Sequence, residues 1–266
     1  GFQVTLEGDG GTATLSESTA NLVPTSQKVN AVQPSTMTKH GNTTEIAATE
    51  NTISWNSPTA GHSKVYKQNY GFIDHGKDML LTQTICIESM PASSGVIHTT
   101  GDFANDTYYF WMCDYNDKGT DDQIENNSGT AVFGVVYADA EGNLYFRLRN
   151  DISEDTVENA GVPLGKKLGD TFQLSVLWRA DDSAEAYVDG KPVLSVTDAT
   201  LVKTSGLGAK CMQFLYKNSV TRPAEEAAKL TVSDIKVLCA DVTSVKEEIT
   251  QIKNAYPSPR KSKLVF

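Results

Sequence analysis

Residues 172–196, FQLSVLWRADDSAEAYVDGKPVLSV, contain the clearest structural pattern of this sequence. Apolar residues occupy every second position of residues 172–178, which predicts a strand with one buried face. A polar turn at residues 181–183 separates this strand from a second alternating run at residues 184–188. Asp189-Gly190 then predicts a tight hairpin, because glycine tolerates the positive φ that a type I′ turn requires. We therefore expect a three-strand antiparallel meander here.

The same residues resemble a known superfamily. A strand that ends in Trp178, an acidic turn and the sequence AYVDGKPV at residues 186–193 are similar to the central hairpins of the concanavalin A-like lectin/glucanase superfamily, in particular its laminin G-like domains. The resemblance covers about residues 50 to 240 of the printed sequence. It implies a jelly-roll sandwich and says less about activity, because functional sites are grafted onto folds.

The rest of the chain is also rich in strand patterns separated by turn residues. We predict strands at residues 80–87 (LLTQTICI), 96–99, 108–113 (YYFWMC), 131–137 (AVFGVVY), 144–149 (LYFRLR), 211–217 (CMQFLYK) and 230–238 (LTVSDIKVL). We interpret residues 151–170 as an acidic loop and residues 223–229 as one helical turn. Such a series of short strands favours an all-β, two-sheet antiparallel jelly-roll sandwich, with Trp178 in its core.

The pattern changes at both ends of the predicted sandwich, which we place at residues 51–240. Residues 1–50 are loop-rich with short strands, and we expect this N-terminal extension to pack on the sandwich. In residues 241–254, apolar residues recur at steps of three and four, which predicts a short C-terminal amphipathic helix. A basic tail completes residues 241–266. Because the chain begins at Gly1 without a signal peptide, we expect it to be cut from a longer protein.

Composition excludes some classes of function. The net charge of −10 and the pI near 4.9 argue against nucleic-acid binding, which requires clustered Lys and Arg. The sequence has no apolar run of about 18 residues, so we expect no membrane insertion. An acidic, polar surface suits an extracellular or cell-surface protein, and we expect a monomer.

The four cysteines are widely spaced. Without a CxxC pair, a zinc site is not expected. We favour buried free thiols, while disulfides between neighbouring strands remain the alternative for a secreted protein. The cysteines are Cys86, Cys113, Cys211 and Cys239.

Residues 114–125, DYNDKGTDDQIE, place oxygen ligands at the spacing of a calcium-binding loop. Lys118 stands where an oxygen ligand is expected, and the flanking segments are predicted strands and not helices. An acidic solvated loop is therefore the alternative interpretation. The resemblance favours a calcium site, because sandwich lectins often carry a loop calcium. The candidate ligands are Asp114, Asn116, Asp122 and Glu125, and calcium is the only cofactor we expect.

Aromatic residues crowd residues 108–115. In the lectins that this sequence resembles, aromatic faces stack on sugar rings while polar side chains bind the hydroxyl groups. Because strand neighbours alternate, either Tyr109 and Trp111 or Tyr108 and Phe110 point away from the core. The alternative is that these aromatics are core residues and that the outward Tyr and Arg are ordinary cross-strand pairs. We predict a carbohydrate-binding set on one solvent-facing sheet, comprising Tyr109, Trp111, Tyr145, Arg147 and Tyr187.

No catalytic pattern is evident. Glucanases of the resembling superfamily carry Glu-x-Asp-x-x-Glu on a strand, and this spacing is absent. No G-x-S-x-G motif is present. His40, His62, His75 and His98 show no metal-ligand spacing and no partner pattern, so we interpret them as surface residues. We therefore assign no catalytic residue.

The resulting hypothesis is a secreted or cell-surface, non-catalytic glycan-binding module of a bacterial multidomain protein. Its partner would be a polysaccharide or the glycan of a glycoprotein. One alternative is a glycoside hydrolase or polysaccharide lyase on the same fold, which would require two carboxylates in an aromatic cleft for hydrolysis. A second alternative is a structural or adhesin domain without a small ligand, which predicts an exposed apolar patch instead.

Overall fold

The computed structural model describes residues 3–8, 11–16, 29–67, 78–95, 105–115, 130–149, 161–179, 183–196 and 209–240. Within these ranges the chain is built from β-strands and a few short 3₁₀ turns. The strands are β1 (Gln3–Gly8), β2 (Gly11–Ser16), β3 (Val29–Ala31), β4 (Thr38–Gly41), β5 (Ile46–Ala48), β6 (Thr52–Ser57), β7 (Gly61–Lys67), β8 (Asp78–Ser89), β9 (Thr107–Tyr115), β10 (Thr130–Ala138), β11 (Asn143–Arg149), β12 (Val162–Lys167), β13 (Thr171–Trp178), β14 (Ala184–Val188), β15 (Lys191–Val196), β16 (Ala209–Asn218) and β17 (Ala228–Ala240). The 3₁₀ turns are η2 (Pro34–Thr36), η3 (Thr43–Glu45) and η6 (Ala224–Glu226).

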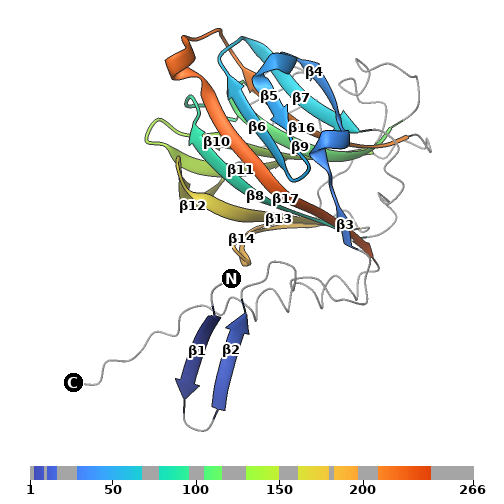
Figure 1. The fold of residues 1–266 in the computed structure, drawn as a ribbon, viewed down its shortest axis with the longest axis vertical. Helices are drawn as coiled ribbons and strands as arrows, with labels where there is room; N and C mark the ends of the chain where they lie inside the picture. The colour runs from blue at the N-terminus through green and yellow to red at the C-terminus, as the bar shows by residue number, and fades with distance from the viewer. Residues whose placement is uncertain are drawn as a thin grey trace.

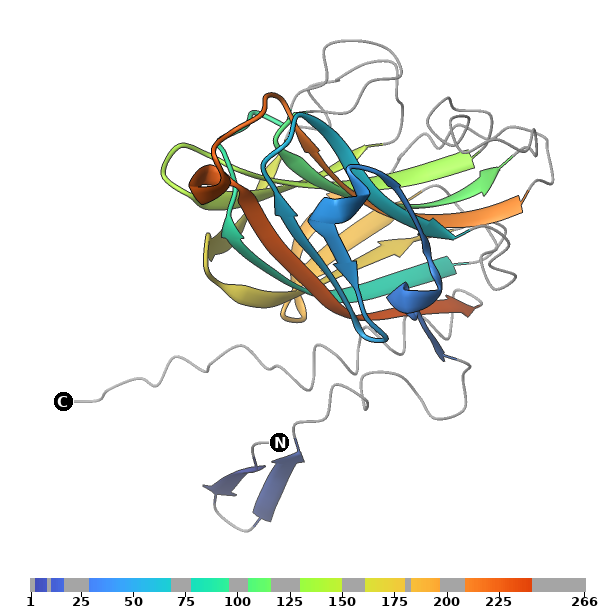
Figure 2. The same cartoon turned by 45° about the horizontal axis from the view of Figure 1, so that its top comes forward.

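Two large antiparallel sheets form the body of the molecule (Figure 1). One sheet, which we name the front sheet without reference to the view in the figures, has the strand order β12-β11-β10-β9-β16-β7-β4 among the described residues. The back sheet has the order β15-β14-β13-β8-β17-β6-β5, and β3 also pairs with β17. Figure 2 shows the same two layers after a rotation of 45°. The predicted all-β, two-sheet antiparallel sandwich is therefore confirmed. A separate hairpin is formed by β1 and β2, which pair with each other.

The core lies between the two sheets. Alternate residues of both sheets face inward and form one cluster of buried apolar side chains, as expected for a sandwich with period-two strands. Trp178 of β13 is only 1% exposed and packs edge-on against Phe110 of β9, at 6.5 Å between ring centroids. Phe110 also stacks on Phe146 of β11. The prediction that Trp178 is a core residue is confirmed.

The meander at residues 172–196 forms as predicted, as β13, β14 and β15. Leu174 lies opposite Val188, and Ala186 lies opposite Leu194 in the next pair of strands. Asp189 and Gly190 both have positive φ, 48° and 74°, as the two central residues of a type I′ turn require. This hairpin lies at one edge of the back sheet.

One predicted loop contains a strand. Residues 162–167, VPLGKK, form β12 at the edge of the front sheet, within the segment that we interpreted as an acidic loop. Pro and Gly weaken the strand pattern there, yet an edge strand tolerates a proline because one of its sides makes no ladder hydrogen bonds. The helical turn predicted at residues 223–229 is present as η6.

The structure describes part of the predicted N-terminal extension, including residues 29–50, and none of residues 241–266. Strands β3, β4 and β5, within the first 50 residues, are hydrogen-bonded into the two large sheets. The predicted C-terminal helix and the predicted strand at residues 96–99 lie outside the described residues, and the division into three segments stays a prediction.

Within the described ranges no helix is long and apolar enough to cross a membrane. Cys86 is a free thiol, as predicted. Its side chain is half-buried, whereas a fully buried thiol was expected.

Candidate functional site

The face of the front sheet that points away from the core is polar and aromatic. Val65, Tyr108, Val136 and Phe146 belong to the core cluster, so their neighbours along each strand face the other way. These outward positions include His, Lys, Tyr, Gln and Arg residues from six adjacent strands. Those with described side chains are His40, His62, Lys64, Tyr66, Tyr109, Tyr137, Tyr145, Arg147, Gln213 and Lys217.

Strand register aligns six of the outward residues in one row across the sheet. His40 lies opposite Lys64, and Lys64 lies opposite Leu215. The row continues through Tyr109 and Val135 and ends at Arg147. Since neighbouring strands are about 4.8 Å apart, Lys64 and Arg147 are separated by about 19 Å. The row therefore places a basic residue at each end of an apolar and aromatic middle.

Two basic residues of this row, Lys64 and Arg147, are buried. Lys64 is 0% exposed and its Nζ lies 5.7 Å from the centroid of the Tyr66 ring, a cation–π distance. Arg147 is 5% exposed, and its Nη1 donates to the Gly95 carbonyl oxygen at 3.3 Å. Burying a charge is costly unless other groups compensate it, and both residues make further interactions besides these contacts.

A pair of stacked tyrosines lies at the β10–β11 end of the same face. The rings of Tyr137 and Tyr145 are 5.4 Å apart and nearly parallel. Tyr137 is covered by two glycines, since a Cβ on Gly95 would lie 2.6 Å from its ring and a Cβ on Gly161 would lie 1.9 Å from its hydroxyl oxygen. Burial raises the pKa of Tyr137, and the Arg147 charge partly offsets this. Tyr145 remains half-exposed, which leaves its ring accessible to a ligand.

Asp139 fixes the turn that carries Tyr145. Its carboxylate accepts hydrogen bonds from the backbone and side-chain nitrogens of Asn143, both at 2.8 Å, and from the hydroxyl of Tyr145 at 3.3 Å. The side-chain hydrogen bond from Asn143 is the main reason that the pKa of Asp139 lies below its usual value. The Asp139 charge in turn raises the pKa of Tyr145, which therefore stays a neutral donor.

The predicted carbohydrate-binding residues do not form one site. Tyr109 and Arg147 share the row described above, and Tyr145 lies two residues from Arg147 on β11. Trp111 lies on β9 opposite Gln213, and its side chain is outside the described part of the chain. Tyr187 lies on β14 in the back sheet, so placing all five residues on one sheet was wrong.

Solvent exposure also differs from the prediction. Tyr109 is 0% exposed and Tyr187 is 3% exposed, whereas a solvent-facing sheet was expected. Tyr187 donates a hydrogen bond to the Glu185 carboxylate, which also forms a 3.0 Å ion pair with Arg179. Burial raises the pKa of Tyr187. These contacts account for Tyr187 as a structural residue of the back sheet.

A histidine pair that the sequence pattern did not predict lies at the other end of the front sheet. His40 and His62 were interpreted as surface residues without a partner, but their rings stack at 5.3 Å and an angle of 11°. Nδ1 of His40 lies 3.1 Å from Nε2 of His62. Both are half-buried. The one sequence signal near this pair is the alternation of His62, Lys64 and Tyr66. By itself, this alternation indicates only the polar face of a strand.

The predicted calcium site lies largely outside the described residues. Asp114 is the last residue of β9 to pair with β10, opposite Thr130, while Asn116, Asp122 and Glu125 fall in the part that the structure does not describe. Among the described residues no three His, Cys, Asp or Glu side chains are grouped so as to hold a metal ion. The calcium site stays a prediction.

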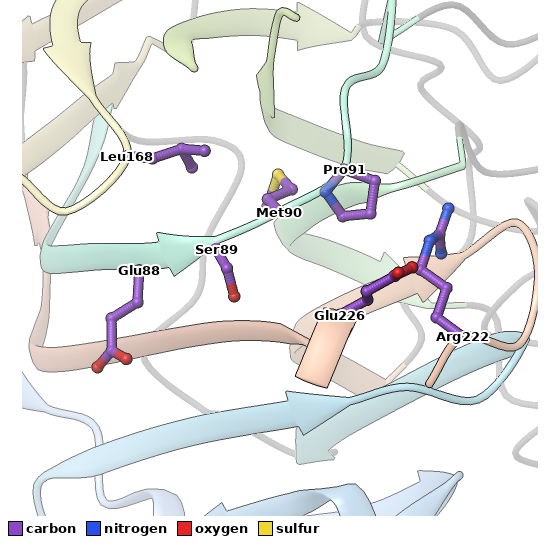
Figure 3. Close-up of a pocket in the computed structure, with 7 residues that line it drawn as sticks. All are labelled: Glu88, Ser89, Met90, Pro91, Leu168, Arg222 and Glu226. Atoms are coloured by element: carbon purple, nitrogen blue, oxygen red, sulfur yellow. The ribbon is translucent and has the colours of Figure 1, made fainter. Parts of the chain in front are cut away.

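A pocket of about 310 Å³ lies at the end of β8, away from these residues (Figure 3). Its walls combine apolar side chains with charged groups, namely Glu88, Ser89, Met90, Pro91, Leu168, Arg222 and Glu226. Arg222 forms a 3.1 Å ion pair with Asp106 and donates to Asn218 at 3.0 Å. The pocket has no aromatic lining residue among those described, so it offers no ring for stacking on a sugar.

Comparisons with known proteins support the fold. The sequence matches no protein-family profile and no curated protein. The structure is similar to the carbohydrate recognition domain of Emp47p, with a TM-score of 0.50 and 12% identity over 82% of this chain and 93% of that one. It also matches the alginate lyase Aly36B in complex with alginate trisaccharide (TM-score 0.46, 10% identity, 80% and 98% of the two chains) and a SAP-like pentraxin from Limulus polyphemus (0.42, 13%, 74% and 80%).

At these identities the likeness concerns the fold alone. The Emp47p domain is a carbohydrate recognition domain by its name, and this chain shares its two-layer antiparallel sandwich over most of both lengths. Activity must be argued from the residues of this chain. The chain therefore has the jelly-roll sandwich architecture that the resemblance implied.

Proposed function

We propose that this chain is a non-catalytic glycan-binding module that uses the outward face of the front sheet. The observation that carries the proposal is the set of partly exposed side chains on this face, with the Tyr145 ring at one end and His40, His62 and Lys217 at the other. Ligand sites in proteins combine apolar and aromatic surface with a few placed polar groups, and this face has that composition. The back sheet offers no comparable set among its described residues.

The accessible side chains are suited to sugar recognition. Tyr145 presents a half-exposed ring next to the buried Tyr137, so a sugar ring can extend the stack. His40, His62 and Lys217 are half-buried at the other end of the face, where their N–H groups can donate to hydroxyl or carboxylate oxygens. Buried neighbours such as Gln213 and Tyr109 would hold these residues in place.

The cellular setting is part of the same proposal. We place the module in a secreted or cell-surface bacterial protein with several domains, because an acidic polar surface and a glycan partner suit that location. We also retain a calcium ion at residues 114–125 as a structural aid to binding. Both statements derive from the sequence pattern.

Polysaccharide lyase activity is the second candidate. It is favoured by the contact between His40 and His62, because histidine is the residue most often used as a general base or acid near neutral pH. Lys217, which is half-buried and lies opposite His62, would stabilise negative charge that develops on a uronate during elimination. Among the described outward positions of the front sheet none is Asp or Glu, so the paired carboxylates of a glycoside hydrolase are not offered there.

Affinity electrophoresis tests the proposal. The full chain is run in native gels that contain plant, bacterial or host polysaccharides, beside Tyr145→Ala and a control, Lys191→Ala, which removes an exposed lysine of the back sheet. We expect retardation by at least one polysaccharide, reduced in Tyr145→Ala and unchanged in the control. Release of unsaturated sugar ends from the retained polymer would favour the lyase instead. Equal migration in every gel would reject glycan binding.

A further inference from the structure

Three leucines lie side by side on the outer face of the back sheet, which is the face that points away from the core. Leu80 of β8 lies directly opposite Leu238 of β17 and, on its other side, Leu177 of β13. Residues next to them along the strands, such as Leu81 and Val176, belong to the core cluster, so the three leucines point away from it. We call Leu238, Leu80 and Leu177 the leucine row.

The leucine row is buried, although it lies outside the core cluster. Leu80, Leu177 and Leu238 are 2%, 0% and 3% exposed. Beside the row on the same face, Ser175 is 1% exposed, and its buried hydroxyl has no hydrogen-bond partner. A polar group or water above this hydroxyl would satisfy it, so the groups that surround it are apolar. The outer face is therefore covered at this place by an apolar surface.

The segment that follows β17 begins beside the leucine row. β17 ends at Ala240, two residues after Leu238. The sequence predicts an amphipathic helix at residues 241–254, and its apolar stripe runs from residue 242 to residue 252, which is about 15 Å along a helix. The leucine row crosses three neighbouring strands and is about 10 Å long, so the stripe is long enough to cover it. The stripe consists of Val242, Val245, Ile249 and Ile252.

Other segments that adjoin the back sheet in sequence are less suited to this role. Residues 17–28 precede β3, residues 68–77 precede β8 and residues 197–208 follow β15. Each contains only two or three large apolar residues, and none has a stripe of four at helical spacing. Residues 241–254 are therefore the segment whose sequence best matches an apolar sheet face.

We propose that residues 241–254 form a helix that packs its apolar stripe on the leucine row. The occupant of this outer face is then a segment of the same chain, and neither a second copy nor a ligand. Because a helix and a sheet each bury an apolar face against another element, one contact satisfies both. The inference concerns the back sheet and does not depend on the glycan-binding proposal for the front sheet.

Hydrogen exchange of the full chain, followed by mass spectrometry, tests the proposal. An isolated helix of this length is marginal in water, so slow exchange of residues 241–254 requires packing. We expect exchange in the wild type to be at least about tenfold slower than in an unstructured peptide of the same sequence. Ile249→Asp, which places a charge in the stripe, should abolish this protection and increase the binding of a hydrophobic dye. Gln251→Asp, which places the same charge on the polar side of the predicted helix, should change neither.

A double-mutant cycle tests the contact itself. Urea unfolding is measured for Leu177→Ala, Ile249→Ala and their combination, and Gln251→Ala replaces Ile249→Ala in the control cycle. The change in the unfolding equilibrium constant of the Leu177/Ile249 double variant should differ by about twofold or more from the product of the single changes, whereas Leu177 and Gln251 should act independently. Should Leu177→Ala fail to fold, the exchange comparison decides, since its variants leave the sheet unchanged.

Independent effects of Leu177 and Ile249, or equal effects of the two Asp variants, would overturn the proposal. Fast exchange of residues 241–254 in the wild type would also overturn it. In that case, a dimer in light scattering would assign the covering surface to a second copy. Slow exchange of residues 17–28, 68–77 or 197–208 in a monomer would assign it to that segment instead.

Discussion

The hydroxyl of Tyr108 donates a 2.8 Å hydrogen bond to Oε1 of Gln83 in the middle of the core. Tyr108 belongs to β9 of the front sheet and Gln83 to β8 of the back sheet, so one polar contact joins the two layers. Both residues are 0% exposed. Because the bond is buried, it helps to fix how the two sheets are aligned.

Tyr108→Phe should therefore destabilise the fold by about 1–3 kcal/mol, because it leaves the Gln83 oxygen buried without its donor. Urea unfolding followed by fluorescence measures the change. The matched control is Tyr108→Phe combined with Gln83→Leu, which removes both polar partners and should be more stable than the single variant. A single variant as stable as the wild type would show that the bond contributes nothing.

Buried tyrosines also predict a loss of stability at alkaline pH. Burial raises the pKa values of Tyr108 and Tyr216 above those of the unfolded chain. Below pH of about 10 both states keep these hydroxyls protonated, but above it only the unfolded chain loses the protons, so stability falls by up to about 1.4 kcal/mol per pH unit for each tyrosine.

The difference in stability between wild type and Tyr108→Phe isolates this effect. It should be constant below pH of about 10 and should narrow above that pH, since the variant lacks one of the titrating groups. Urea unfolding midpoints measured at several pH values give the difference. A constant difference at all pH values would indicate that Tyr108 ionises equally in both states.

Gly134 is required by the packing of Phe110. A Cβ at residue 134 would lie 2.2 Å from Cζ of the Phe110 ring, in the centre of the core. Gly134→Ala should destabilise the fold by about 1–3 kcal/mol through overpacking. Adding Phe110→Leu should recover part of the loss, because the shorter side chain vacates that space. If the double variant is less stable than both single variants, close contact is not the cause.

Asp106 and Arg222 form an ion pair that holds the connection between β16 and η6. Their side chains are only 10% and 15% exposed, and Asp106 also accepts hydrogen bonds from the backbone and hydroxyl of Ser219. Asp106→Ala should cost about 3 kcal/mol, because it leaves the arginine largely buried without its partner. Asp106→Asn should cost less, since Asn tolerates the positive φ of 57° and can still accept hydrogen bonds. Thermal unfolding distinguishes the two, and equal losses would show that the positive φ and the hydrogen bonds of residue 106 contribute nothing beyond its charge.

Local sequence patterns predicted the strands but not which strands share a sheet. The meander at residues 172–196 was predictable because alternation and the Asp189-Gly190 turn are both local. Tyr187 was assigned to the wrong sheet because its neighbours Ser175 and Glu185 come from the same meander. No local pattern indicates which of the two sheets contains that meander. Strand β12 was not predicted because an edge strand needs little alternation of apolar and polar residues.

The candidate site was less predictable than the fold. His40 and His62 are 22 residues apart and meet only because β4 pairs with β7, and Arg147 lies on the same face only through four further strand pairings. Each strand by itself shows an ordinary polar face. The burial of Lys64 and Arg147 could not be predicted either. Alternation along a strand indicates to which face of the sheet a side chain points, but not whether other residues cover that face.

The most direct test of the central claim is a glycan array probed with the full chain and with the double variant Tyr145→Ala/His62→Ala. These two residues lie at opposite ends of the outward face of the front sheet and are half-exposed. Lys191→Ala/Lys229→Ala, which changes two exposed lysines of the back sheet, is the control. We predict glycan signals that the front-sheet variant loses and the control keeps. Signals retained by the front-sheet variant, or lost equally in the control, would contradict a binding site on this face.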